Sequence, residues 1–251
     1  MSQNITLTLN GKEITATPNQ TILQAAEANG VYIPRLCYLK DIHEEGNCRV
    51  CSVKVNDFKM MKPACKTLVE PGMRVVTDDL EIYQTVRMNL ELLSHKHSFE
   101  CFTCSREDDC EFLDLISRYS VDNELNHLYG DYGLPSYFSN SSDVMTIDSS
   151  KCVLCGRCVS ACENYTGLGI LNYNKRGSHT YVGPALFHNL EDAGCIFCGK
   201  CIQSCPTGAL REKDDIKLVE HALRDPSKTV VVQVAPSIRA ALGESFGLPI
   251  G

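Results

Sequence analysis

The segment CVLCGRCVSAC at 152–162 recurs 43 residues later as CIFCGKCIQSCP at 195–206. Both segments space four cysteines as C-x2-C-x2-C-x3-C, so each supplies a dense group of thiols from one short loop. Gly156 and Gly199 occupy the same place in the two segments, where a residue without Cβ permits a tight turn that aims backbone N–H groups at sulfur. Pro206 follows the last cysteine and is expected to begin a helix. The repeat predicts two metal-binding loops within one domain.

This spacing resembles that of bacterial ferredoxins with two 4Fe-4S clusters, in which the fourth cysteine of each segment binds the cluster of the other segment. A loop with three cysteines can surround only one side of a cubane, so the fourth thiolate must come from elsewhere. The resemblance implies one 4Fe-4S cluster on Cys152, Cys155, Cys158 and Cys205, and another on Cys195, Cys198, Cys201 and Cys162. Zinc is the alternative, because paired cysteines also build zinc sites.

Residues 1–78 are predicted to form a separate α+β unit. Apolar residues alternate on both sides of Asn10-Gly11, which is a strong signal for a β-hairpin. A helix follows, with Asn19 or Thr21 as its cap and Gly30 at its end. Further strands are expected at 50–55 and 74–77. The order of hairpin, helix and strands suggests a β-grasp fold.

Four cysteines of this unit carry a second kind of cluster motif. They are Cys37, Cys48, Cys51 and Cys65, with the central pair in the sequence GNCRVC. A close pair with a distant partner on each side resembles a plant-type 2Fe-2S ferredoxin in outline. The longer gap after Cys37 resembles the ferredoxin-like domain of respiratory complex I and its hydrogenase relatives. Gly46 allows the backbone to bend close to sulfur. Zinc is again the alternative.

Residues 79–120 are predicted to form a small helical domain with a mixed ligand set. A helix beginning near Asp78–Asp79 leads to the pattern His97-x3-Cys101-x2-Cys104-x5-Cys110. Only three cysteines are present, so His97 is the expected fourth ligand, with His95 as its local rival. The pattern resembles the histidine-ligated 4Fe-4S site of iron-only hydrogenases and of the large iron–sulfur subunit of complex I. A Cys3His zinc site is the alternative.

The remaining segments connect and extend these units. A linker is expected over 121–147, with a helix over 111–125 leading into it and a polar loop over 130–143. The two-cluster domain is assigned to 148–220. The tail, 221–251, is predicted to contain a helix, a buried strand at 229–235 and a second helix.

Composition argues against other classes of protein. The net charge of −7 comes without any basic block, which disfavours a nucleic-acid partner. No apolar run reaches the length of a membrane span. The repeated C-x-x-C spacings, the odd total of fifteen cysteines and an N-terminus without a signal-peptide pattern disfavour disulfides. A protein of the reducing cytoplasm is expected.

The whole order of motifs resembles the N-terminal iron–sulfur region of iron-only (FeFe) hydrogenases, where VVQVAPSIRAALGESFG at 231–247 is similar to the start of the catalytic domain. The resemblance implies one 2Fe-2S and three 4Fe-4S clusters that relay single electrons in a hydrogenase or formate dehydrogenase complex. The implied partners are a flavin- and NAD-binding iron–sulfur subunit and a catalytic subunit, with ferredoxin as another donor. All fifteen cysteines belong to these four sites, so no substrate-converting site is expected. A truncated iron-only hydrogenase and a zinc-binding scaffold are the alternatives.

Overall fold

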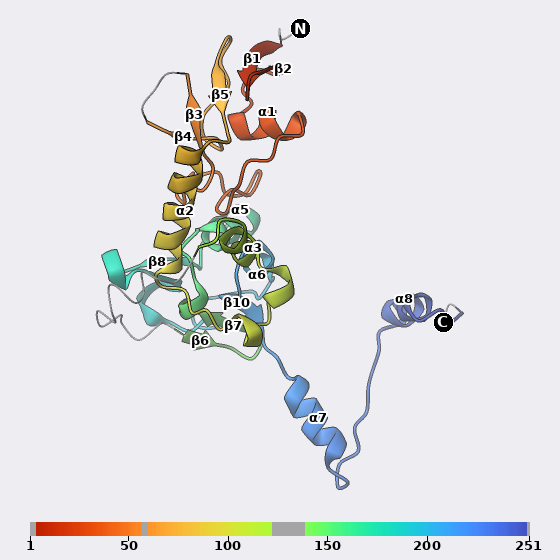
Figure 1. The fold of residues 1–251 in the computed structure, drawn as a ribbon. Coiled ribbons are helices and arrows are strands. Elements are labelled where there is room, and N and C mark those ends of the chain that lie inside the picture. The colour runs from red at the N-terminus through yellow and green to blue at the C-terminus, as the bar shows by residue number, and fades with distance from the viewer. Residues whose placement is uncertain (1–3, 57–59, 122–138, 250–251) are drawn as a thin grey trace. The chain divides into compact units, whose positions relative to one another are not determined.

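The computed structural model describes residues 4–56, 60–121 and 139–249. The chain divides into two compact units, Met1–Lys213 and Asp214–Gly251. The first unit holds all the predicted cluster ligands and mixes helices with three small sheets (Figure 1).

A five-stranded mixed sheet forms the N-terminal part of the first unit. Its order is β2 (Lys12–Ala16), β1 (Ile5–Leu9), β5 (Arg74–Val76), β3 (Ser52–Val55) and β4 (Lys62–Pro63). Strand β1 runs parallel to β5, and the other neighbours are antiparallel. The predicted hairpin is confirmed, because Asn10 and Gly11 make the turn between β1 and β2 with φ values of 50° and 78°. Two positive φ values are typical of the tight turn that joins twisted strands.

Helix α1 (Ile22–Ala28) covers this sheet and closes its core. Of the two candidate caps, Thr21 is the N-cap, and it exchanges hydrogen bonds with Gln24 in a capping box. Such a cap stabilises a helix by about 1 kcal/mol. Leu23 of the helix is fully buried with Val53 of the sheet, and each buried aliphatic side chain contributes roughly 1.5–3 kcal/mol.

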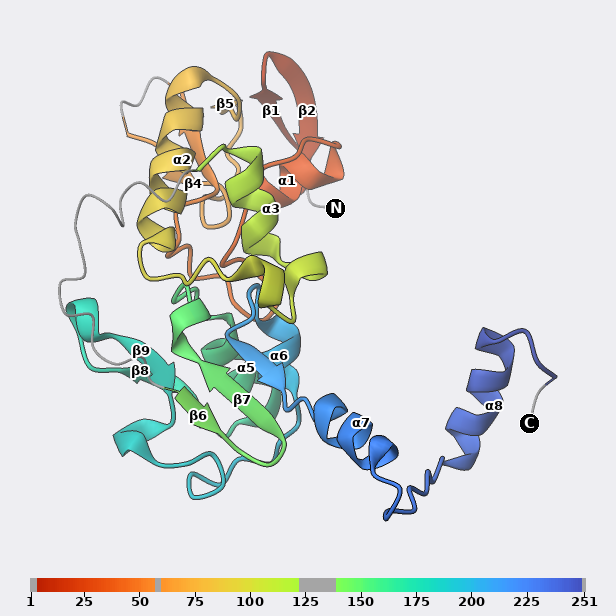
Figure 2. The same ribbon diagram turned by 60° about the horizontal axis from the view of Figure 1, so that its bottom comes forward.

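Two helices form the next layer, and they lie beside each other in Figure 2. Helix α2 (Leu80–Ser94) begins after Asp79, whose carboxylate accepts the Ile82 N–H at 2.8 Å. Two 3-10 turns, η1 (Cys101–Thr103) and η2 (Glu107–Asp109), lead to α3 (Glu111–Arg118). The helix predicted over 111–125 is too long, because α3 ends at Arg118 and Ser120 has a φ of 46° that a right-handed helix does not allow.

The last third of the first unit combines two helices with two small sheets. Sheet strands β6 (Ser139–Ser141), β7 (Met145–Asp148) and β10 (Leu210–Glu212) take the order β10-β7-β6, and β8 (Asn172–Asn174) pairs with β9 (Tyr181–Gly183). Helix α5 (Arg157–Thr166) packs on α6 (Lys200–Ser204). Three 3-10 turns complete this part: η3 (Ser149–Lys151), η4 (Gly177–His179) and η5 (Ala185–Phe187).

Two expectations for this part need correction. The loop predicted over 130–143 lies partly outside the described residues, and its described end forms β6, which pairs with β7. No helix begins at Pro206. The chain instead turns there and enters β10, because Leu210 pairs with Ile147 of β7.

The second unit contains α7 (Ile216–Arg224) and α8 (Pro236–Ser245), which confirms the two predicted helices. The buried strand predicted at 229–235 is wrong: Val231 and Val232 are 83% and 79% exposed, and the segment has no strand. A run of β-branched residues needs a paired neighbour to become a strand, and no sheet of the described residues includes it. Among the described residues, no helix is both long enough and apolar enough to cross a membrane.

Candidate metal centres

Four cysteines from the two repeated segments line one hollow. These residues, the Cys152 site from here on, are Cys152, Cys155, Cys158 and Cys205. Three come from the loop and first turn of α5, and Cys205 ends α6. Apolar residues of β7 and β10, Ile147 and Leu210, complete the wall.

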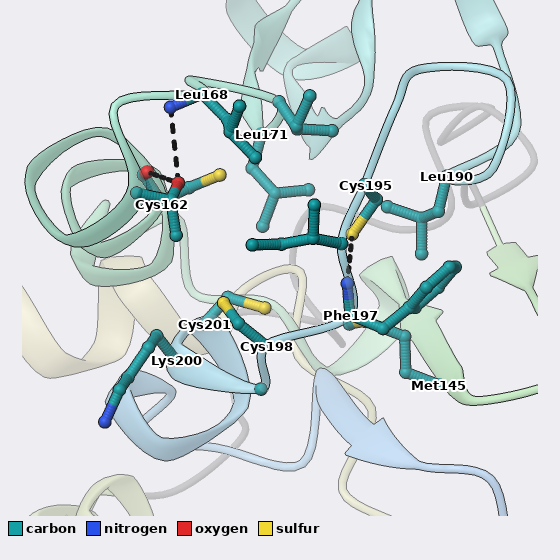
Figure 3. Close-up of a pocket in the computed structure, with 14 residues that line it drawn as sticks. Met145, Cys162, Leu168, Leu171, Leu190, Cys195, Phe197, Cys198, Lys200 and Cys201 are labelled. Carbon is teal, nitrogen blue, oxygen red and sulfur yellow. Dashed lines mark hydrogen bonds between the residues drawn. The ribbon is translucent and has the colours of Figure 1, made fainter.

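The other four cysteines of the repeat line a second hollow. These residues, the Cys195 site, are Cys162, Cys195, Cys198 and Cys201 (Figure 3). Cys162 comes from α5, whereas the rest come from the loop and first turn of α6. Because α5 packs on α6, each helix carries one cysteine to the hollow of the other segment. The structure thus brings together both sets implied by the ferredoxin resemblance.

The two loops repeat one strained backbone geometry. Leu154 and Phe197, the second residues after the first cysteines, have φ values of 53° and 52°. Their N–H groups donate to the sulfurs of Cys152 and Cys195, each at 3.4 Å. Left-handed conformations are costly outside glycine and occur where the surrounding structure imposes them. The sequence indicated tight turns at the neighbouring Gly156 and Gly199, whose φ values are 86° and 73°. It gave no signal for Leu154 and Phe197, because their residue type does not favour a positive φ.

Burial opposes the ionisation of three thiols of the Cys152 site, those of Cys152, Cys155 and Cys158. Burial, together with neighbouring thiols, raises the pKa of Cys152 to about 12 and raises that of Cys158 well above its usual value. Burial likewise raises the pKa of Cys201 to about 12 in the Cys195 site. Buried thiolates require a compensating positive charge, which a bound metal centre supplies. The donor sets therefore fit iron–sulfur clusters.

The Cys37 site gathers four deeply buried cysteines beneath the N-terminal sheet. They are Cys37, Cys48, Cys51 and Cys65, none more than 8% exposed. The Cys37 N–H donates to Cys48 Sγ at 3.4 Å, and the sulfurs of Cys51 and Cys65 lie 3.3 Å apart. The hydrogen bond from the Cys37 thiol lowers the pKa of Cys48. A cluster would replace these thiol contacts with bonds to iron.

Gly46 closes the Cys37 site from one side. It has a φ of 65°, and an added Cβ would lie 2.9 Å from Lys66 Cγ and 3.4 Å from Cys65 Sγ. A side chain at this position would therefore collide with Lys66 and touch the Cys65 sulfur, which a residue without Cβ avoids. The sequence argument placed this role at Gly46, and the close approach is its structural basis.

His97 is held in one tautomer by the backbone. Its Nδ1 lies 3.1 Å from the carbonyl oxygen of Lys151, which can only accept a hydrogen bond, so Nδ1 carries the proton. Burial lowers the pKa of His97, which favours the neutral ring. Its edge contacts with Phe99 and Phe112 fix the ring further. The Nε2 lone pair is then available to a metal, as in other histidine sites with an oriented second nitrogen.

The three cysteines that share the predicted site with His97 are only partly buried. Cys101 is the first residue of η1 and Cys104 follows its end, and Cys110 caps α3 by accepting the Leu113 N–H at 3.4 Å. A Cβ added to Gly208 would lie 2.6 Å from Cys104 Sγ, so the chain after α6 lies close to this sulfur. These three cysteines and His97, which the sequence pattern assigns to one centre, are called the His97 site from here on. The rival His95 ends α2 and lines a different cavity, together with Cys48 and Cys152.

Sequence reasoning missed the residues that connect the sites. The Lys151 carbonyl that holds His97 also accepts the Thr207 hydroxyl at 2.8 Å, and Thr207 Oγ1 lies 3.7 Å from Cys205 Sγ. Arg157, beside Cys158, is 4% exposed and bonds to two other parts of the first unit. A single sequence carries no signal for either role, because both depend on contacts between distant segments.

Three family models match separate stretches of the chain. A 2Fe-2S iron–sulfur cluster binding domain matches residues 2–79, and a 4Fe-4S dicluster domain matches 151–209. Between them, residues 87–124 match the iron–sulfur binding region of NADH-ubiquinone oxidoreductase-G. These stretches contain the four sites described above. Both kinds of cluster-binding domain are therefore present.

Whole-chain comparisons connect the domains to one family. The gamma subunit of the NAD-reducing hydrogenase HoxS of Cupriavidus necator is 32% identical over 71% of this chain and 75% of its own length. The chain belongs to this family of hydrogenase iron–sulfur subunits. A crystal structure of an NAD+-reducing [NiFe]-hydrogenase in the H2-reduced state shares the fold of the family, with a TM-score of 0.74 and 28% identity over 83% of this chain and 87% of that one.

The family also extends into longer proteins. Iron hydrogenase 1 of Clostridium pasteurianum is 36% identical over 98% of this chain, but the match covers 42% of that relative. The chain therefore spans less than half of this relative, and the alignment reaches the tail that sequence comparison had related to the start of a catalytic domain. The family relationship predicted from the motif order is confirmed.

Proposed function

We propose that the chain holds one 2Fe-2S and three 4Fe-4S clusters and relays single electrons within a multisubunit oxidoreductase. The Cys37 site takes the 2Fe-2S cluster, and the His97, Cys152 and Cys195 sites take one 4Fe-4S cluster each. When bound, such clusters accept and release one electron at a time at potentials set by ligand charge, hydrogen bonds and solvent exposure. The protein's residues position the clusters and tune those potentials.

One observation carries this proposal. The eight cysteines of the repeat separate into two hollows, each lined by one complete set of four that includes a cysteine from the other segment. Zinc would need its ligands within about 2.3 Å of a single ion. In the Cys152 and Cys195 sites the four cysteines are instead arranged around a hollow. A cubane, which spreads its thiolates around a larger core, suits these hollows.

The proposed partners follow from the relatives. HoxS is named as an NAD-reducing hydrogenase, of which the gamma chain is one subunit. By this similarity, the chain would pass electrons between an NAD(P)H- or flavin-binding subunit, or a ferredoxin, and a catalytic subunit of a hydrogenase or formate dehydrogenase. The proposed boundaries of its parts are 1–78, 79–120, 121–147, 148–220 and 221–251. A cytoplasmic location is part of the proposal and rests on the fifteen thiols.

Metal analysis of the anaerobically purified chain tests the cluster content. We expect a brown protein with about 14 iron atoms per chain and a matching amount of acid-labile sulfide. Electron paramagnetic resonance (EPR) of the reduced protein should show one 2Fe-2S signal together with 4Fe-4S signals. A colourless protein that contains zinc would reject the proposal in favour of a zinc-binding scaffold.

A second candidate is an iron-only hydrogenase without its active-site domain, which the 98% coverage by Iron hydrogenase 1 favours. Both candidates predict the same four clusters. They differ in whether the chain passes electrons to a separate catalytic subunit or is part of an iron-only hydrogenase. Co-purification with a flavin- and NAD-binding subunit would support the electron-transfer subunit. Because the four sites use all fifteen cysteines, we expect no hydrogen evolution from reduced methyl viologen by the chain alone. Measurable evolution would overturn that expectation.

A further inference from the structure

We propose that Arg157 is a positioning residue that ties together three of the four cluster sites, and that its charge raises the reduction potential of the cluster at the Cys37 site. This inference rests on the proposed cluster content. Arg157 immediately precedes Cys158 of the Cys152 site. Its guanidinium bonds to Tyr38, which follows Cys37, and to Glu111, which follows Cys110 of the His97 site. One side chain therefore contacts residues adjacent to ligands of two other clusters.

The geometry of these bonds is specific to arginine. Nη1 and Nη2 donate to the two carboxylate oxygens of Glu111 at 2.6 and 2.8 Å, and Nη2 also donates to the Tyr38 carbonyl at 3.2 Å. A planar guanidinium can serve a carboxylate with two parallel bonds and still reach a third acceptor, whereas a lysine ammonium acts as a point charge. Arg157 is 4% exposed, so this arrangement is fixed inside the first unit.

The positive charge of Arg157 acts more strongly on nearby groups because the side chain is buried, away from the screening effect of water. Arg157 is 4% exposed, and its Nη2 lies 3.2 Å from the carbonyl oxygen of Tyr38, the residue next to Cys37, so the charge is shielded from solvent and lies near the Cys37 site. A cluster becomes more negative when it accepts an electron, so a fixed cation nearby stabilises its reduced form. Removing the cation should lower the reduction potential, and removing the Glu111 carboxylate should raise it.

Other hydrogen bonds also join the segment around residues 42–47 to the segment around residues 155–164 that contains Arg157. We therefore expect variants of Arg157 to fold. Asn47 Nδ2 donates to the Cys155 carbonyl at 3.1 Å, and Asn164 Nδ2 donates to the Ile42 carbonyl at 2.7 Å. Glu111 is 47% exposed in its side chain and can be hydrated when its partner is absent. Replacement of Arg157 therefore does not leave a deeply buried carboxylate alone, which is the usual reason that broken ion pairs prevent folding.

The test is a redox titration of the full cluster-loaded chain, monitored through the EPR signal of the 2Fe-2S cluster. For Arg157→Gln we expect the reduction equilibrium to shift about tenfold toward the oxidised form, a fall in midpoint potential of about 59 mV. Arg157→Lys keeps the charge and should stay closer to the wild-type potential than Arg157→Gln. Glu111→Gln should move the potential upward.

Two controls separate charge and position from general damage. Asn164→Ala removes a neutral hydrogen bond from the same contact surface, and Lys213→Gln removes a positive charge from a pair with the fully exposed Asp143. Both should leave the 2Fe-2S potential at the wild-type value. If Arg157→Gln shifts the potential no more than these controls, the inference is wrong.

The remaining outcomes are also decisive. Should Arg157→Gln fail to retain its clusters, Glu111→Gln and Arg157→Lys carry the test, and an unchanged or lower potential in Glu111→Gln overturns the inference. A wild-type chain without a 2Fe-2S signal would instead reject the proposed function. A wild-type chain with four clusters and unresponsive variants would reject only the role of Arg157.

Discussion

The Nδ1 atom of His97 lies 3.1 Å from the carbonyl oxygen of Lys151, the residue directly before Cys152. This bond fixes the proton on Nδ1 and joins the His97 site to the first loop of the repeat. Burial also lowers the pKa of His97, so the ring is neutral and its other nitrogen can bind a metal. A neutral ligand in place of a thiolate leaves a cluster with one negative charge fewer, which raises its potential.

Replacement of His97 should therefore affect one cluster selectively. In His97→Ala we expect loss or conversion of one 4Fe-4S signal in EPR, with the 2Fe-2S signal retained. His97→Cys should restore a four-ligand site and lower its potential, because a thiolate adds a negative charge. His95→Ala is the matched control and should leave all signals in place. A normal spectrum for His97→Ala, or a defect in His95→Ala alone, would transfer the ligand role to His95 or another group.

Gly46 provides a test of the Cys37 site. Gly30 has a similar backbone conformation but no side chain close to it, so it serves as the control. An alanine at Gly46 would place Cβ 2.9 Å from Lys66 Cγ and 3.4 Å from Cys65 Sγ at a φ of 65°, so the chain beside Cys65 would have to shift, whereas Gly30, at 71°, has nothing within 4 Å of an added Cβ. Both substitutions cost about 1–2 kcal/mol of backbone strain. We expect Gly46→Ala to lose or distort the 2Fe-2S signal and Gly30→Ala to keep it. Equal effects in the two variants would mean that strain alone matters at Gly46.

Thr207 offers a test of the connection between the His97 and Cys152 sites. Its buried hydroxyl donates to the Lys151 carbonyl at 2.8 Å, and such a bond contributes about 1 kcal/mol. Valine has nearly the same shape without the hydroxyl. We expect a chelator to remove iron about fivefold faster from Thr207→Val than from the wild-type chain, while Thr207→Ser stays close to wild type. If Thr207→Val loses iron at the wild-type rate, the bond does not protect the clusters.

Local sequence signals were sufficient to predict several helices and strands and the grouping of the eight cysteines of the repeat. Hairpins and caps depend on a few adjacent residues, so Asn10-Gly11 and the Thr21 region indicated the correct elements. The cysteine spacing also predicted which cysteines lie together, because a short loop restricts which of its thiols can face the same hollow. The eight cysteines of the repeat line two hollows in the grouping that the ferredoxin resemblance implied.

The sequence-based predictions that were wrong or missing share one physical cause: they depend on contacts between segments that are distant in the sequence. Pro206 has the residue type of a helix start, but pairing of Leu210 with Ile147 draws the chain into a strand. The valines at 230–232 have the residue type of a buried strand, yet they remain exposed. Arg157 looked like an ordinary residue between two ligands, and only its bonds to Tyr38 and Glu111 reveal its position among three sites.

The last prediction concerns the crossed arrangement of the repeat, in which the fourth cysteine of each segment lies with the first three of the other. Cys205 lies with the first segment's thiols, and Cys162 lies with those of the second. Cys205→Ala should therefore damage the cluster at Cys152, Cys155 and Cys158, and Cys162→Ala should damage the other. Both should lose the same amount of iron, so the variants control for each other.

The two clusters can be told apart by how exposed their ligands are. Cys198 is exposed, whereas Cys155 and Cys158 are buried. A mild oxidant or chelator should therefore attack the Cys195 site first in the wild-type chain. Cys205→Ala leaves the Cys195 site intact, so the repeat's one remaining 4Fe-4S signal in that variant should be lost quickly. Cys162→Ala leaves the Cys152 site intact, so the remaining signal in that variant should resist the reagent. The opposite assignment of lability would mean that each segment binds its cluster with its own four cysteines, and the crossed arrangement would be wrong.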